Sequence, residues 1–261
     1  MICIFGGTAA YHLTPADFGD AEALPPLETP FGPAPIFLRL ARPSPVDVLP
    51  TARKRGSGAG VLFSSRHGAD KLARSAAFVN HRANLWAAKE YGATAILSWN
   101  GVGAINPRLA VGDMIAPHDL LDATRARELT ALPPGEWPGV KEVFWESGRT
   151  ALLSAVEQTP SPDGAVRRKG GGVYVCTEGP RLETPAEIAA FARMGADVVG
   201  MTLVPEVFIA AEMGLPYASV CIVTNIAAGL ATPESPRRFG PEVGREGLAV
   251  CLRAAEIIEK S

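Results

Sequence analysis

The chain has 261 residues, of which 47% are apolar, and this length and composition allow one large core. Its formal net charge of −2 gives no electrostatic reason to expect nucleic acid or an anionic membrane as a partner. No stretch approaches the roughly 20 apolar residues of a membrane span, and the first residues lack the charged leader and apolar run of a signal peptide. We therefore expect a cytoplasmic protein.

The cysteine pattern argues against a zinc site. Cys3, Cys176, Cys221 and Cys251 lie far apart, and three of them lie within apolar runs. The sequence has neither a CxxC pair nor a cysteine–histidine cluster. This pattern favours reduced thiols in the core, so no metal is expected.

The first predicted strand spans residues 2–5, and Gly6-Gly7-Thr8 follows it directly. Such a turn can present backbone N–H groups and a hydroxyl to an anion. The same residues also suit an ordinary tight turn with a capping threonine, so both interpretations stay open. Two more strands are predicted at 35–39 and 60–64, within a stretch rich in proline and glycine.

The tetrapeptide Ser65-Arg66-His67-Gly68 follows the strand at 60–64 and places a guanidinium beside an imidazole. Arginine suits bidentate recognition of phosphate, and histidine adds a hydrogen-bond donor. A solvated loop with an incidental histidine is the alternative. A helix is then predicted at 80–91, because apolar residues recur along one face and Gly92 can close it.

A buried strand at 93–98 runs into Asn100-Gly101-Val102-Gly103-Ala104, predicted to be a second turn that offers amides to an anion. A strand is expected at 111–115, and helices are expected at 147–157 and 241–259. Residues 123–139 have the composition of a loop. Trp137 in this loop is either a local packing anchor or an aromatic that covers a neighbouring subunit's pocket.

The most informative stretch is residues 171–229. A strand at 173–176 precedes the charged turn 178–181, and Thr184-Pro185-Ala186-Glu187 fits a capping box that begins a helix. A strand at 197–200 leads to Met201-Thr202 and a second helix, and a strand at 218–223 ends at Thr224-Asn225. Three strands thus carry polar residues at their carboxyl ends, where ligands bind in open α/β sheets. The pattern predicts an active site.

In this order, the motifs resemble those of the trimeric purine nucleoside phosphorylases, most closely the methylthioadenosine phosphorylase branch. They are Gly6-Gly7-Thr8, Thr29-Pro30-Phe31-Gly32, Arg66-His67-Gly68, residues 80–86 (NHRANLW), Val111-Gly112-Asp113, Glu178-Gly179-Pro180-Arg181, residues 195–207 and Val223-Thr224-Asn225. The resemblance covers nearly the whole chain. It implies one α/β domain, residues 1–261, with a mixed central sheet flanked by helices. It also implies a homotrimer that cleaves purine nucleosides with inorganic phosphate as co-substrate and without a cofactor.

The resemblance also implies residue roles. The implied phosphate ligands are Thr8, Arg66, His67, Asn100, Gly101 and Thr202. Met201 is expected against the ribose, and Trp137 is expected in a neighbouring subunit's pocket; the residues expected around the base are Leu182, Glu183 and Asn225. The expected catalytic residues are Asn225, Glu183 and His67, because hydrogen bonds that tighten in the transition state promote the reaction.

Two positions favour a 6-oxopurine base. The methylthioadenosine branch generally has an aspartate at the position of Asn225 and a serine at that of Glu183. An asparagine amide can accept from a protonated N7 and donate to a 6-oxygen, and Glu183 can accept from N1–H. Inosine and guanosine are therefore the expected substrates. Gly240 or Pro241 occupies the position of the family's 5′-hydroxyl ligand, so methylthioinosine is a candidate beside inosine.

Other interpretations stay open. A methylthioadenosine phosphorylase, a nucleosidase that uses water, and a non-catalytic purine-binding protein would share much of this pattern. Thr8, Arg66 and His67 favour a phosphate site over a water site, because water needs no anion cradle. Taken singly, several residues also have structural interpretations: a helix-terminal charge at Glu183, a helix cap at Thr202, core packing at Leu182 and Met201, and support at His81 and Arg181.

Overall fold

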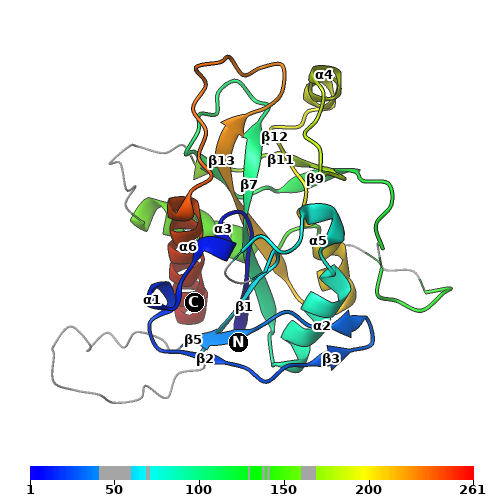
Figure 1. The fold of residues 1–261 in the computed structure, drawn as a ribbon, viewed down its shortest axis with the longest axis vertical. Helices are drawn as coiled ribbons and strands as arrows, with labels where there is room; N and C mark the ends of the chain where they lie inside the picture. The colour runs from blue at the N-terminus through cyan, green and yellow to red at the C-terminus, as the bar shows by residue number, and fades with distance from the viewer. Residues whose placement is uncertain (41–59, 69–70, 129, 137–138, 140–141, 160–168) are drawn as a thin grey trace, which may run out of the picture.

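A computed structural model describes residues 1–40, 60–68, 71–128, 130–136, 139, 142–159 and 169–261. Four parallel strands form the centre of the sheet in the order β13-β7-β1-β6. They are β13 (Tyr217–Ile226), β7 (Ala95–Ala104), β1 (Ile2–Gly6) and β6 (Val61–Ser65). Figure 1 shows these strands between two layers of helices.

Shorter strands extend this centre and make the sheet mixed, as predicted. β5 (Leu38–Leu40) pairs antiparallel with β6, and β2 (Ala21–Ala23) follows it. At the other edge, β8 (Met114–Ile115) pairs antiparallel with β13 and parallel with β10 (Lys169–Gly170). The second half of β7 pairs antiparallel with β12 (Val198–Gly200), which leads to β11 (Val173–Thr177) and β9 (Asp119–Ala123). A separate hairpin joins β3 (Glu28–Thr29) and β4 (Gly32–Pro33).

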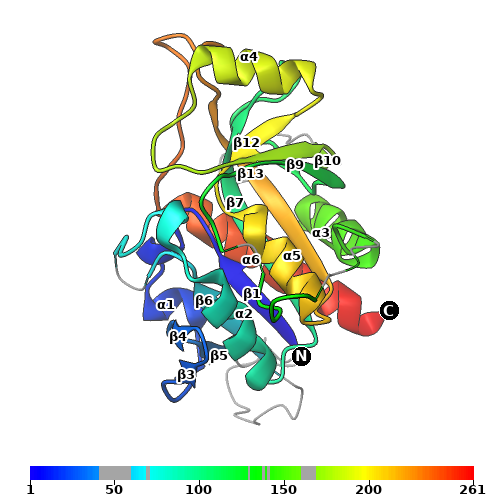
Figure 2. The same ribbon diagram turned by 90° about the vertical axis from the view of Figure 1, so that its right-hand side faces the viewer.

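Helices cover both faces of the sheet. α3 (Glu146–Gln158) and α6 (Pro241–Lys260) lie on one face, and α2 (His81–Glu90) and α5 (Leu203–Glu212) lie on the other (Figures 1 and 2). Because strand side chains alternate between faces, Ile4 and Leu97 belong to one core cluster and Phe5 and Ile96 to another. The remaining helices are short: η1 (Ala10–His12), α1 (Pro15–Phe18), η2 (Ala76–Phe78) and α4 (Pro185–Arg193).

Local sequence signals place the helix starts. At α4, the Thr184 hydroxyl accepts from the Glu187 backbone N–H, and the Glu187 carboxylate accepts from the Thr184 N–H, so the predicted capping box is confirmed. At α2, the Asn80 side chain accepts from the Ala83 N–H. The predicted terminal helix is confirmed as α6.

The glycine-rich segment after residue 98 is not a turn, contrary to the prediction. β7 continues through Gly101 and Gly103 to Ala104, because its second half has partners on both sides, β13 and β12. The Gly101 backbone approaches Thr8 closely; a Cβ at Gly101 would lie 2.5 Å from the Thr8 Oγ1. Glycine at position 101 therefore permits a close contact between two backbone segments.

The polar residues at the ends of β11, β12 and β13 were predicted to meet at one edge of the sheet, but the structure brings them together in another way. β12 runs antiparallel to β7, whereas β13 runs parallel to it, so their carboxyl ends do not share one edge of a parallel sheet. They come together because β7 lies between them: Val199 of β12 and Asn225 of β13 both align with Gly103. The long second half of β7 therefore organises this part of the molecule.

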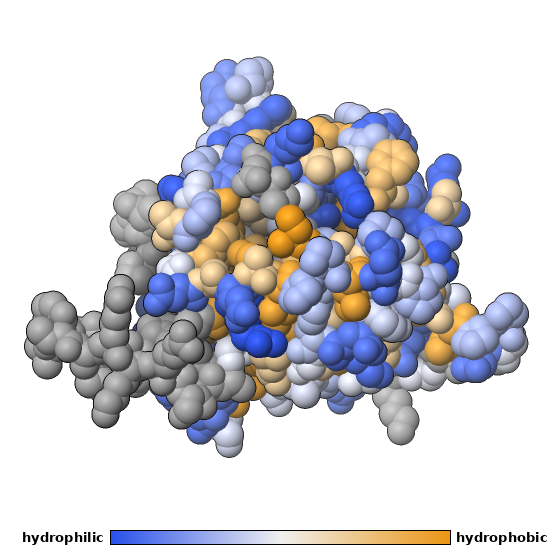
Figure 3. Space-filling view, turned by 60° about the horizontal axis from the view of Figure 1, so that its bottom comes forward, coloured by the Kyte–Doolittle hydropathy of each residue, from blue (hydrophilic) through white to orange (hydrophobic). Residues whose placement is uncertain are grey.

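The surface is mixed in character. On the face shown in Figure 3, apolar residues reach the surface near the centre and hydrophilic residues surround them. Within the described ranges, no helix is both long and apolar enough to span a bilayer.

Candidate active site

A cavity of about 310 Å³ lies where β7, β12 and β13 meet the loop after β1. Eight of the predicted site residues line it: Thr8, His67, Gly101, Leu182, Glu183, Met201, Thr202 and Asn225. Arg66 and Asn100 do not line it, and Trp137 lies outside the described residues. Segments far apart in the sequence therefore converge on one cavity, largely as predicted.

Thr8 and Gly101 line the cavity and are in contact with each other. The Thr8 hydroxyl accepts a hydrogen bond from the Gly101 N–H at 3.1 Å, and the Thr8 carbonyl accepts one from the Trp99 indole N–H at 3.0 Å. The Thr8 loop is thus fixed to β7 through both its side chain and its backbone. A hydroxyl held in this way is ready to meet an anion, because little reorganisation is needed.

His67 also lines the cavity, and its tautomer is defined. Its Nδ1 lies 2.9 Å from the Arg74 carbonyl oxygen, which can only accept, so Nδ1 carries the proton. Burial lowers the pKa of His67 to about 4. At neutral pH the ring is therefore uncharged, and Nε2 holds a lone pair that can accept a hydrogen bond.

Arg66 lies behind the cavity wall rather than in it. Its Nε and Nη2 each donate to the Glu206 carboxylate at 2.6 Å, and both side chains are fully buried. Its Nη1 donates to the Trp99 carbonyl at 3.0 Å and lies close to Gly7, where a Cβ would meet it at 3.0 Å. Arg66 therefore supports the Gly7–Thr8 loop from below. Nothing in the sequence indicated that Glu206 would occupy its guanidinium.

Glu206 is held as a buried anion. Burial disfavours its charged form, but the charge of Arg66 and hydrogen bonds from His81 and Arg66 outweigh burial and hold the pKa of Glu206 well below its usual range. His81 Nδ1 lies 3.0 Å from the Glu206 carboxylate. The structural role expected for His81 agrees with this contact.

A buried chain of polar side chains runs from Glu206 to the cavity. The Tyr217 hydroxyl donates to Glu206 at 2.6 Å, and Ser98 lies 2.7 Å from Tyr217 and 2.8 Å from Ser219. The Asn100 amide donates to the Ser219 hydroxyl at 2.6 Å and accepts from the Thr202 hydroxyl at 2.5 Å. Asn100 thus lies beneath Thr202 and orients its hydroxyl, instead of facing the cavity as predicted.

Glu183 and Asn225 line another part of the cavity. The Glu183 carboxylate accepts from the Thr177 hydroxyl at 2.6 Å and is 9% exposed. The Asn225 Nδ2 donates to the Ile226 carbonyl at 3.0 Å, and its Oδ1 accepts from the Thr224 hydroxyl at 3.1 Å. A β-bulge between residues 223 and 225 turns this part of β13 toward the cavity. Thr177 was missed by the sequence reasoning, although it ends β11 shortly before Glu183.

The loop before α4 forms the rim. Leu182 is 68% exposed there, so it is not an ordinary core residue. Arg181 does not line the cavity, and its guanidinium pairs with Glu187 at 2.7 Å, as its expected supporting role requires. Met201 packs beneath the loop: a Cβ at Gly179, whose φ is +64°, would lie 2.6 Å from the Met201 Sδ.

Phe239 and Arg237 line the cavity just before α6, and the sequence reasoning missed both. It placed the corresponding contact at Gly240 or Pro241, but these residues form the N-terminus of α6 and do not line the cavity. Of the chain's histidines, all of which the structure describes, His67 alone lines it. Ala228 and Ala231 also line the cavity, so its lining combines the cationic Arg237 with apolar side chains.

Known proteins are similar to this chain in sequence and in fold. Residues 53–257 match the family model described as the phosphorylase superfamily. A probable S-methyl-5′-thioinosine phosphorylase from Methanothermobacter thermautotrophicus is 38% identical over 88% of this chain and 73% of its own. A 6-oxopurine nucleoside phosphorylase from Pyrococcus furiosus is 34% identical over 88% of this chain and 81% of its own.

Among solved structures, a methylthioadenosine phosphorylase from Schistosoma mansoni in complex with adenine superposes with a TM-score of 0.77 at 26% identity. The superposition covers 100% of this chain and 93% of that one. The family match, the sequence relatives and the shared fold agree with the resemblance in the motifs. The chain belongs to the phosphorylase superfamily.

Proposed function

We propose that this protein catalyses the phosphorolysis of purine nucleosides, with a 6-oxopurine as the preferred base and inorganic phosphate as co-substrate. The observation that carries the proposal is a single cavity that is lined by the hydroxyl-bearing residues Thr8 and Thr202 and the imidazole of His67, and also by Glu183 and Asn225. Relatives named as 6-oxopurine nucleoside and methylthioinosine phosphorylases support it. Within the described residues no cluster could hold a metal ion, and the proposed reaction requires none.

The phosphate is proposed to bind between Thr8, Gly101, His67 and Thr202. The Thr8 hydroxyl accepts from the Gly101 N–H and keeps its own proton for phosphate. The Thr202 hydroxyl donates to Asn100 and would have to turn away from it to donate to phosphate. Neutral His67 can accept a hydrogen bond at Nε2 from the protonated oxygen of hydrogen phosphate. This fixes which phosphate oxygen keeps the proton and leaves an unprotonated oxygen free to attack C1′.

Arg66 is proposed to promote phosphate binding indirectly, by holding the Gly7–Thr8 loop in place. Its guanidinium is committed to Glu206, and its Nη1 supports the Trp99 carbonyl beneath the Thr8 loop. The Trp99 indole in turn holds the Thr8 carbonyl. Replacing Arg66 would therefore disturb phosphate binding through Thr8 as well as through lost charge.

Asn225 and Glu183 are proposed to stabilise the departing base. As the glycosidic bond breaks, negative charge develops on the imidazole ring of the purine. Asn225 can accept from the protonated N7 and donate to the 6-oxygen, and Glu183 can accept from N1–H. These hydrogen bonds strengthen as the charge develops, so they lower the barrier rather than only bind substrate.

The 5′ substituent is proposed to contact Phe239. The Phe239 ring suits contact with a methylthio group, whereas a free 5′-hydroxyl requires a polar partner, which Arg237 could supply. Methylthioinosine is therefore a substrate candidate equal to inosine. A methylthioadenosine phosphorylase is the second candidate function, favoured by the solved structures, whereas the Asn225–Glu183 pair opposes it.

A release assay tests these proposals together. Purine release is measured from inosine, guanosine, methylthioinosine, adenosine and methylthioadenosine, each with and without phosphate and with a chelator. We expect phosphate-dependent, chelator-insensitive release that is fastest for the 6-oxopurines. Release that is equally fast without phosphate would indicate a nucleosidase, and no release from any nucleoside would indicate a binding protein.

A homotrimer is proposed as the assembly. Phe78 and Leu182 are 71% and 68% exposed, and both belong to segments that border the cavity. A subunit contact over these segments would bury both side chains, which is the support that they give to the proposal. Light scattering at micromolar concentration tests this, and a fully active monomer would contradict it. The role of Trp137 and the cytoplasmic location stay predictions from the sequence.

A further inference from the structure

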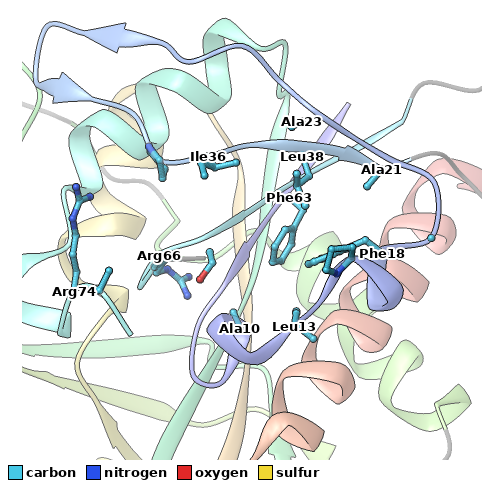
Figure 4. A pocket seen from close by; sticks show the side chains of 16 residues that line it. Ala10, Leu13, Phe18, Ala21, Ala23, Ile36, Leu38, Phe63, Arg66 and Arg74 are labelled. Atoms are coloured by element: carbon cyan, nitrogen blue, oxygen red, sulfur yellow. The ribbon is translucent and has the colours of Figure 1, made fainter. Parts of the chain in front are cut away.

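A second cavity, larger than the first, lies on the other side of the Arg66–Gly68 segment. Its volume is about 470 Å³, and it lies between β5 and β6 and the η1–α1 segment (Figure 4). The residues that line it are Ala10, Leu13, Pro15, Phe18, Gly19, Ala21, Ala23, Pro35, Ile36, Leu38, Phe63, Ser65, Arg66, Gly68, Ala73 and Arg74. The two cavities share no lining residue, so the second one is a separate space.

Most of this cavity is apolar. In Figure 4, Phe18, Phe63 and Leu13 lie toward one end, and Arg66 and Arg74 lie toward the other. Ile36, which also lines it, is 64% exposed. Ligand sites typically combine a concave apolar wall of roughly 300–1,000 Å³ with a few placed polar groups, and this cavity has that composition.

The polar end contains an unsatisfied hydroxyl. Ser65 is 9% exposed, and its Oγ is buried without a hydrogen-bond partner among the described residues. A buried hydroxyl without a partner is disfavoured, because it has lost its hydrogen bonds to water. Because this Oγ has no accessible surface in the present rotamer, a ligand oxygen at the polar end would satisfy it only after the hydroxyl turns toward the cavity.

The charge at the polar end of the cavity indicates which charge the head group of a ligand must carry. No aspartate or glutamate lines the cavity in the described part of the chain, whereas two arginines do. The guanidinium of Arg66 is committed to Glu206, so Arg74 is the cation that remains for a ligand. The Arg74 side chain is exposed, and no ion pair to it occurs within the described residues. The head group that fits is therefore an anion that can also accept from a hydroxyl.

We propose that this cavity is a second binding site, for a small organic anion with an apolar body, such as a medium-chain carboxylate. The carboxylate would meet Arg74 and the Ser65 hydroxyl, and the alkyl chain would lie against Phe18, Phe63 and Leu38. The proposal does not depend on which nucleoside the protein cleaves, because binding is measured directly and not through turnover.

Activity is the wrong readout for this site. The Arg74 carbonyl accepts from His67 Nδ1 at 2.9 Å, so changes at Arg74 can reach the active-site cavity through the backbone. Calorimetry with octanoate as the probe avoids this problem. Saturating phosphate and hypoxanthine are included, so that octanoate is not competing for an empty active-site cavity.

The probe series separates head group from tail. Octanoate is compared with octylamine and 1-octanol, and butyrate, hexanoate and octanoate are compared with each other. We expect one octanoate per chain, affinity that rises about fourfold for each added methylene, and much weaker binding of the amine. Equal binding of the amine and the carboxylate, or no octanoate binding at millimolar concentration, would overturn the proposal.

Variants locate the binding. Ala21→Phe places a ring into the cavity from an exposed position on edge strand β2 and should weaken octanoate binding at least tenfold. Arg74→Gln should weaken it about three- to fivefold, because a solvent-exposed ion pair is weak.

Arg39→Gln is the matched control: Arg39 is exposed on β5 but does not line the cavity, so binding should not change. A melting temperature near that of wild type shows that each variant is folded. If Ala21→Phe folds and binds octanoate normally, the site lies elsewhere and the proposal is wrong.

Discussion

The two ends of the active-site cavity differ in what lies behind them. At the end proposed to bind phosphate, Thr202 is 7% exposed and is connected through Asn100 to the buried chain that ends at Glu206. At the end proposed to bind the base, Asn225 bonds to its own chain neighbours, and Leu182 is 68% exposed on the rim. Glu183 is buried there, but its one hydrogen bond is to nearby Thr177. The first end is connected to a buried network that spans the core, whereas the second depends on a bulge and a loop.

This difference matches what each end must recognise. An anion is stabilised most by donors that are oriented before it arrives, because no reorganisation is then needed during the reaction. A base is recognised by the pattern of donors and acceptors on its edge, and that pattern changes when one or two side chains change. Substitutions in the buried network behind the phosphate end should therefore lower the unfolding free energy. Substitutions at the base end should leave the unfolding free energy nearly unchanged and alter substrate specificity.

Glu206→Gln should produce the largest effect, at the buried end of the network. The substitution leaves Arg66 without its anionic partner in the core, and breaking such a buried pair costs about 3–5 kcal/mol of unfolding free energy. Urea unfolding measures it. The control is Glu187→Gln at the exposed Arg181 pair, where solvent screens the charges and glutamine preserves the capping box. Equal losses in the two variants would contradict a fixed phosphate end.

Asn225→Asp combined with Glu183→Ser should move the preference from 6-oxopurines toward 6-aminopurines. A carboxyl group can accept from the 6-amino group, and removing Glu183 removes an acceptor that would face the unprotonated N1 of adenine. Each exchange alters one or two hydrogen bonds, so about 1–3 kcal/mol per site is expected, or roughly ten- to hundredfold in the kcat/KM ratio of inosine to adenosine. The unfolding free energy should change little. An unmoved ratio would mean that these residues do not contact the base.

Lowering the pH should destabilise the protein through His67. An unfolded histidine binds its proton near pH 6.5, and folded His67 binds its proton near pH 4. Between these values the unfolded state holds more protons, so stability falls as the pH drops through this window, by up to about 2 kcal/mol at pH 5. The His67→Gln variant should lose less stability over the same window. If both lose the same amount, other groups account for the pH dependence.

Thr8→Val should produce the smallest effect and the most specific one. The substitution keeps the shape but removes the hydroxyl, with an expected loss of about 0.5–1.5 kcal/mol in phosphate binding. The KM for phosphate should rise several-fold while the KM for nucleoside stays near that of wild type. Thr8→Ser, which retains the hydroxyl, should restore most of the phosphate affinity. A change confined to the nucleoside KM would place Thr8 at the other end of the cavity.

The sequence was a good guide to elements with local signals. The capping box at Thr184, the helix after Asn80 and the terminal helix depend on neighbouring residues, so they could be predicted. The extension of β7 through Asn100 and Gly101 could not, because it depends on pairing with β12 and β13, which are distant in sequence. Glycines that suggest a turn proved to permit a close approach by Thr8.

The site residues show the same difference between what neighbouring residues determine and what distant contacts determine. Motifs identified the cavity-lining residues Glu183, Thr202 and Asn225, since the chemistry of each side chain is visible in the sequence. The partner of Arg66 was not visible, because Glu206 lies on α5 and reaches Arg66 only in the folded core. A motif can name a charged residue, but it does not tell whether that charge is available to a ligand.

The bulge in β13 has a consequence for evolution. β13 pairs with β7 from Tyr217 to Val223 and, after a shift in register, again at Asn225 and Ile226. A new side chain at position 225 therefore changes what the cavity recognises without requiring the central strands to pair again. We expect the base preference of this fold to change during evolution by single substitutions at position 225. Because the unfolding free energy stays nearly constant, no intermediate sequence needs to lose its fold.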